Sequence, residues 1–314
     1  MADLGARLAL LAGAVMAALG AALGHVPAHA AEVVVTIKPL HGLAARVMAG
    51  AGTPHLLVQG ALSPHTYSLK PSDAARLNTA NVFIRMSDAM EPFTARIVKA
   101  LPRRVQVVTL ADTPKLRLLP RRTGAMFPEP TEGHGHNHDH GTTDGHAWLD
   151  PVNAKLMVDR IAEALSKRAP GGAAAFRSNA ARLKDDLDAL SAELARDLAP
   201  VAGKPYVVFH DALQYFEQRY GLKAVGAIAV SPEVPPGARR LSVLRRQILD
   251  HKAECVFAEP RLDTRLVAAV VEGTRARVGT IDPEGVRIEA GPDHYFALLR
   301  GLARDLKACL APTG

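Results

Sequence analysis

Short runs of apolar, often β-branched residues alternate with helix-length stretches in two separate blocks of this 314-residue chain. Strands that alternate with helices favour βαβ units around a mainly parallel sheet. In the first block we expect strands at 32–37, 56–58, 82–85 and 105–109, with helices at 40–49, 71–80 and 91–100. In the second block we expect strands at 206–209, 224–229, 255–258 and 278–281, with helices at 213–220, 237–250, 264–272 and 295–310. Each block can therefore form its own α/β layer.

A loop and a long helix are predicted between the two blocks. Residues 111–144 are rich in Pro, Gly, Thr and His and have no apolar period, which indicates a long loop. From Pro151 onward the pattern is helical and is broken only around Pro170 to Gly172. Its second half carries one apolar stripe at three- and four-residue steps, formed by Phe176, Leu183, Leu187, Leu190, Leu194 and Leu198. The predicted fold class is α/β: two lobes, each with a mainly parallel sheet flanked by helices, joined by a long inter-lobe helix.

The N-terminus has the pattern of a secretory signal peptide. One basic residue, Arg7, precedes an apolar run at 8–23, and Ala28-His29-Ala30 offers a cleavage site. The alternative is an uncleaved anchor, for which the run is short, and no cysteine follows it that could carry a lipid. We therefore predict a signal peptide at 1–30, an N-terminal lobe at 31–169 with a histidine-rich loop at 128–145, a connecting helix at 170–200 and a C-terminal lobe at 201–314.

The cysteines and the charges narrow the class of protein further. Only two cysteines are present, Cys255 and Cys309. In an exported chain such a pair predicts one disulfide, with two free buried thiols as the alternative. The net charge is +7, but the basic residues are dispersed along helical stretches without interleaved aromatic residues. This favours solvated helix faces over a nucleic-acid surface.

Three of the 13 histidines lie in loops at expected strand or helix boundaries, namely His65, His146 and His210. Asp282 directly follows the expected strand at 278–281. In a two-lobed α/β chain the ligand crevice lies beyond the carboxyl ends of the strands. Three imidazoles and one carboxylate suit Zn²⁺ in tetrahedral geometry. Spacing alone leaves each histidine open to an ordinary role as a helix cap or loop residue.

Six short motifs follow one another along the chain. They are Pro64-His-Thr-Tyr-Ser-Leu-Lys-Pro-Ser-Asp73, His146-Ala-Trp-Leu-Asp-Pro151, His210-Asp211, Ser231-Pro-Glu-Val-Pro-Pro-Gly-Ala-Arg239, Cys255-Val-Phe-Ala-Glu-Pro260 and Gly279-Thr-Ile-Asp-Pro283. In this order they resemble the zinc-uptake solute-binding proteins of ABC transporters, the ZnuA-like cluster A-I family. The resemblance extends from Val33 to Leu310.

The resemblance implies a metal site made by His65, His146 and His210, with Asp282 as the fourth or outer ligand. Manganese-binding members have a glutamate where this chain has His210, so the histidine favours zinc. Many zinc members have an acidic residue before the first histidine, where this chain has Pro64. The fourth ligand therefore stays open between Asp282 and water.

Further roles follow for residues around this site. Asp211 is predicted either to orient a ligand histidine or to cap the helix that follows. The placement of Cys255 and Cys309 resembles the disulfide of zinc members. A histidine-rich insertion before the second ligand is also typical of them, and it predicts an auxiliary metal-binding segment that gathers or senses zinc through His134, His136, His138 and His140.

The function predicted from the resemblance is a periplasmic receptor, not an enzyme, that captures Zn²⁺ and delivers it to the permease and ATPase subunits of an ABC transporter. We expect a monomer that does not insert into the membrane once the signal peptide is removed. The alternatives are a manganese or iron receptor of the same family, a zinc-dependent hydrolase, and an adhesion or metal-buffering protein without a transporter. The sequence has no His-Glu-x-x-His motif, which counts against the zinc-dependent hydrolase.

Overall fold

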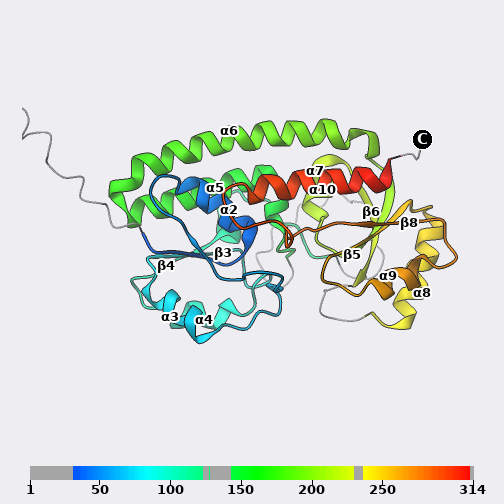
Figure 1. The fold of residues 1–314 in the computed structure, drawn as a ribbon, viewed down its shortest axis with the longest axis horizontal. Coiled ribbons are helices and arrows are strands. Elements are labelled where there is room, and N and C mark those ends of the chain that lie inside the picture. Colours follow the sequence, from blue (N-terminus) through cyan, green and yellow to red (C-terminus); the bar gives the residue numbers. More distant parts are fainter. Residues whose placement is uncertain (1–30, 123–126, 128–142, 230–235, 312–314) are drawn as a thin grey trace, which may run out of the picture. The chain divides into compact units, whose positions relative to one another are not determined.

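Two four-stranded parallel sheets form the framework of the described chain (Figure 1). The computed structural model describes residues 31–122, 127, 143–229 and 236–311. The predicted signal peptide and the four histidines at 134, 136, 138 and 140 lie outside the described residues, as does most of the motif that begins at Ser231. Residues 31–314 group as one unit, so the predicted division of the mature chain into two lobes and a connecting helix stays a prediction.

The first sheet has the strand order β2-β1-β3-β4. Its strands are β1 (Val33–Val35), β2 (His55–Leu56), β3 (Val82–Arg85) and β4 (Gln106–Thr109). All neighbouring strands pair in parallel. Every residue of β1 and β3 is buried, because helices cover both faces of the sheet.

The second sheet repeats this plan with the order β6-β5-β7-β8. Its strands are β5 (Pro205–His210), β6 (Lys223–Ala229), β7 (Cys255–Ala258) and β8 (Arg277–Thr280). They also pair in parallel. The disulfide predicted as one of two possibilities is present and joins Cys255 in β7 to Cys309.

Nine α-helices connect and cover the sheets within the described residues. They are α2 (Lys38–Val47), α3 (Pro71–Thr79), α4 (Thr94–Ala100), α5 (Pro151–Arg168), α6 (Ala173–Leu198), α7 (Gln214–Tyr220), α8 (Ala238–Asp250), α9 (Thr264–Val271) and α10 (His294–Leu310). Helix α4 begins three residues later than the predicted 91–100, because the Glu91 carboxylate accepts hydrogen bonds from the backbone N–H groups of Met86 and Ser87. These bonds fold residues 86–91 into a turn.

The long helix α6 carries the predicted apolar stripe, and all six of its predicted residues are buried. It packs against α5, α2 and α10, as Figure 1 shows for the green helix that runs above them. Asp150 caps α5 by accepting from the N–H of Val152, and Pro151 occupies the first turn, as expected for a helix start.

One continuous core links the two sheets. Along β1, Val33 and Val35 face this shared core, whereas Val34 faces a separate cluster beneath α3 and α4. Along β5, Val208 faces the shared core and Val207 faces a cluster beneath α8 and α9. Since side chains alternate along a strand, each sheet has one face in the common core, which restricts large rotations of one lobe against the other. The predicted fold class is confirmed.

No helix in the described ranges has the length and apolar character needed to cross a membrane.

Candidate metal site

Three histidines from distant parts of the chain meet at one point. His65 lies in the segment between β2 and α3, His146 immediately precedes a short 3₁₀ turn (Ala147–Leu149) that leads into α5, and His210 ends β5. One ring nitrogen from each lies within 4.8 Å of the others. The ring centroids are 5.7 Å apart for His65 and His146, 6.4 Å for His65 and His210, and 5.3 Å for His146 and His210. No other such group of metal-binding side chains occurs in the residues that the structure describes.

Two of these imidazoles are held in the same way by a carboxylate. One oxygen of Asp144 accepts from the backbone N–H of His146 at 3.0 Å and lies 2.7 Å from its Nδ1. One oxygen of Glu259 accepts from the backbone N–H of His210 at 3.2 Å and lies 2.6 Å from its Nδ1. A carboxylate on one ring nitrogen fixes the tautomer and the ring orientation of a metal-binding histidine. The Nε2 atoms of His146 and His210 are buried and have no hydrogen-bond partner among the described residues.

Burial and charge set the protonation of the two histidines differently. Burial lowers the pKa of His146 to about 3, and the charge of His210 adds to this effect. Burial also acts to lower the pKa of His210, but the carboxylate of Glu259 and the charge of Glu284 outweigh it and raise the pKa to about 9. His146 is thus a neutral donor at neutral pH, and a cation at His210 has to displace a proton.

Packing behind the site keeps His146 in place. Trp148 is fully buried, its ring lies 5.3 Å from that of His146, and its carbonyl accepts from the Tyr295 hydroxyl at 2.6 Å. Trp148 is therefore a core residue that fixes the loop carrying His146.

The two predicted acidic residues lie outside the three-histidine group. Both oxygens of Asp282 accept backbone N–H groups, from Val286 at 2.9 Å and Arg287 at 3.0 Å. Asp211 pairs with Arg122, whose Nε donates to it at 2.8 Å. Helix α7 begins at Gln214, with Leu213 in the capping position.

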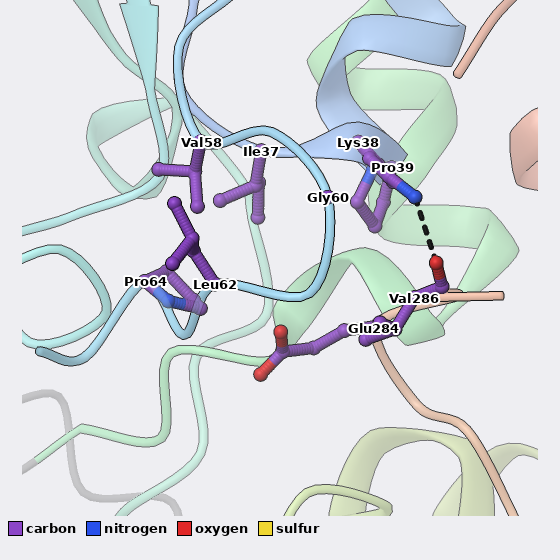
Figure 2. A pocket seen from close by; sticks show the side chains of 9 residues that line it. All are labelled: Ile37, Lys38, Pro39, Val58, Gly60, Leu62, Pro64, Glu284 and Val286. Carbon is purple, nitrogen blue, oxygen red and sulfur yellow. Dashed lines mark hydrogen bonds between the residues drawn. The ribbon is translucent and has the colours of Figure 1, made fainter. Parts of the chain in front are cut away.

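Sequence reasoning missed three acidic residues at this site: Asp144, Glu259 and Glu284. Asp144 stands two residues before His146, a spacing that the sequence displayed. Glu259 follows β7 and belongs to one of the quoted motifs, but only the pairing of β5 with β7 brings it to His210. Glu284 is buried, pairs with Arg261 at 2.6 Å and acts electrostatically on His210. Figure 2 shows its carboxylate beside the segment that carries Pro64.

The base of the predicted histidine-rich loop is described although its histidines are not. Pro120 and Thr143 form an antiparallel bridge, and the N–H of Asp144 donates to the carbonyl of Leu119 at 2.8 Å. The Tyr215 hydroxyl donates to the carbonyl of Asp144 at 2.8 Å. The two ends of the segment are therefore joined beside His146.

Two α/β lobes with three converging imidazoles form an arrangement suited to metal-binding solute receptors. The chain belongs to the ZnuA family, described as zinc-uptake complex component A, periplasmic, whose model matches residues 33–309.

Individual relatives agree with this family. The high-affinity zinc uptake system protein ZnuA of Brucella suis biovar 1 is 43% identical over 309 residues, which covers 89% of this chain and 91% of the relative. A crystal structure of ZnuA matches with a TM-score of 0.75 and 23% identity over 90% of this chain and 100% of that one. The Zn(II)-bound AdcA from Streptococcus pneumoniae matches with a TM-score of 0.71 and 23% identity over 90% of this chain and 58% of that one. These two structures support the fold.

Proposed function

We propose that this chain is the periplasmic zinc receptor of an ABC transporter and that His65, His146 and His210 bind the transported ion. Its family consists of components of zinc-uptake complexes, so a receptor is favoured over a zinc-dependent hydrolase. The arrangement of the three imidazoles is the single observation that supports this ligand set most strongly. Their ligand atoms lie within 4.8 Å of one another, and carboxylates hold the Nδ1 atoms of His146 and His210.

Zinc is the cargo that these donors fit best. Imidazole nitrogen suits zinc, whereas manganese prefers carboxylate and other oxygen ligands. Two of the donors are oriented before the ion arrives, because their carboxylates fix the rings at Nδ1 and leave Nε2 without a partner in the described chain. This supports zinc over manganese, and the family description, a component of zinc uptake, supports zinc over iron.

The fourth position is proposed for Glu284 or a water molecule. Asp282 would have to give up two backbone hydrogen bonds to reach an ion held by the histidines. Glu284 is buried and its charge already acts on His210. A move of Glu284 to the ion would in turn weaken its pair with Arg261.

The cellular setting of the proposal follows from the family and from the N-terminal sequence. A signal peptide at 1–30 would export the chain to the periplasm, and the permease and ATPase subunits would receive the zinc. The auxiliary histidines at 134, 136, 138 and 140 would collect additional ions near the base of the loop beside His146. We propose that the receptor acts as a monomer.

The test is a zinc titration of the mature, demetallated protein, with the bound ions counted by native mass spectrometry. His210→Ala should lose the tight zinc. His251→Ala is the matched control, because His251 is exposed at the end of α8. A protein without a tight zinc, or a tight zinc that His210→Ala leaves unchanged, would overturn the proposal.

A further inference from the structure

The segment that carries His65 runs from the end of β2 to the start of α3. The N–H of Val58 donates to the carbonyl of Thr36, and the N–H of Thr66 donates to Ser63 within the segment. Between them the backbone passes through Gly60 at a φ of +66°, and Leu62 is 46% exposed. Figure 2 shows this segment arching over a hollow lined by Ile37, Val58, Leu62 and Pro64.

Arg261 connects this segment to the C-terminal lobe. It stands two residues after Glu259, in the loop between β7 and α9. One terminal nitrogen donates to the carbonyl of Ala61 at 3.0 Å, and the other donates to Glu284 at 2.6 Å. The guanidinium fork thus spans from the His65 segment to Glu284, whose charge acts on His210.

Lys38 makes a second connection across the same hollow. It is the first residue of α2, and its Nζ donates to the carbonyls of Val286 at 2.8 Å and Ile288 at 2.9 Å. Figure 2 shows the bond to Val286 beside Glu284. Lys38 binds the same turn whose backbone N–H groups, at Val286 and Arg287, donate to the Asp282 carboxylate. Lys38 therefore fixes the position of Glu284 from the N-terminal side.

Both connections use a charged donor, and three of their four acceptors are backbone carbonyls. Hydrogen bonds from a charged donor are stronger than neutral ones. A backbone carbonyl can accept such a bond whatever side chain its residue carries. The shared core already joins the two lobes, so these bonds add to a connection that exists without them.

We propose that Arg261 and Lys38 are positioning residues that hold the His65 segment against the C-terminal lobe and so set the rate at which zinc leaves. This inference rests on the proposed zinc site. Zinc departs when the His65 segment lifts away from the other two histidines, and that movement requires the bond from Arg261 to Ala61 to break. Lys38 keeps Glu284 in place as the partner that fixes Arg261, which corresponds to the proposal with water at the fourth position of the ion.

The experiment measures zinc dissociation from the loaded, mature protein by stopped-flow mixing with an excess of a chromogenic chelator. Arg261→Met and Lys38→Met should each release zinc about tenfold faster, equivalent to about 1.4 kcal/mol. Arg265→Met is the matched control, because Arg265 is exposed and pairs only with Asp263 among the contacts of the described chain. Its release rate should equal that of the wild type.

A conservative variant separates positioning from simple neutralisation of Glu284. Arg261→Lys keeps a positive charge but replaces the two-nitrogen fork with one ammonium group. It should release zinc faster than the wild type. A wild-type rate in Arg261→Lys would mean that only the charge matters and would overturn the positioning role.

Two further readouts complete the test. The thermal unfolding temperature of the metal-free Arg261→Met and Lys38→Met proteins should match that of Arg265→Met, and a selective drop would assign both residues a structural role instead. If the wild type holds a tight zinc and both variants release it at the wild-type rate, the inference is wrong while the zinc site stands. If the wild type holds no tight zinc, the proposed function fails and the inference with it.

Discussion

Replacing Glu259 with alanine removes the carboxylate oxygen that holds His210 at both its backbone N–H and its Nδ1. The imidazole then loses its fixed orientation and the charge that makes it a stronger donor. Loss of such an outer partner lowers metal affinity by about 10- to 100-fold, equivalent to about 1.4 to 2.8 kcal/mol. We expect Glu259→Ala near the upper limit, because Glu259 makes both contacts and is buried. Glu259→Gln keeps an acceptor but no charge and should lose about tenfold.

The assay is competition for zinc against a chelator of known affinity. The unfolding free energy of the metal-free protein is measured in parallel, because an unpaired buried N–H of His210 costs about 1–3 kcal/mol. Glu193→Ala serves as the surface control, since Glu193 lies on α6, pairs with Arg300 on α10 and is partly exposed. An unchanged zinc affinity in Glu259→Ala would refute the view that this carboxylate prepares His210 for the ion.

Three other outcomes are expected. Zinc affinity should decrease as the pH falls below about 9, because the raised pKa of His210 means that a proton competes with the ion; equal affinities at about pH 6 and about pH 8 in chelator competition would contradict this. Replacing Cys255 and Cys309 together with alanine should lower the unfolding free energy by about 4 kcal/mol in denaturant titrations, since their separation is 54 residues; a loss below about 1 kcal/mol would contradict the loop-entropy argument. Deletion of residues 134–140 should leave one tight zinc and remove the looser ions counted by native mass spectrometry, and loss of the tight zinc would contradict an auxiliary role.

Local patterns were sufficient to predict the elements of the fold. The β-branched runs predicted the eight strands of the described residues within one or two residues, and strands buried on both faces, such as β1 and β3, have continuous apolar sequences. The stripe from Phe176 to Leu198 predicted the long helix, because its period places those side chains on one face. The start of α4 was missed because the Glu91 side chain replaces a helical turn with bonds to the backbone.

The order of the strands and the common core could not be predicted in the same way. No local pattern in the sequence predicts that β1 lies between β2 and β3, or that β5 lies between β6 and β7. Those positions depend on long-range pairing, and they decide which loops meet at the crevice. They also let one core run beneath both sheets, which no local period encodes.

For the metal site, the sequence by itself determined the donor types: His65, His146 and His210 stand in motifs that could be recognised one at a time. Only the tertiary structure decided which acidic side chains contact these histidines. Glu259 reaches His210 across 49 residues through the β5–β7 pair, and the Asp282 carboxylate turns to its own backbone. The physical reason is that a hydrogen bond depends on distance and direction in space, and for residues far apart in the chain these are set by packing and not by sequence spacing.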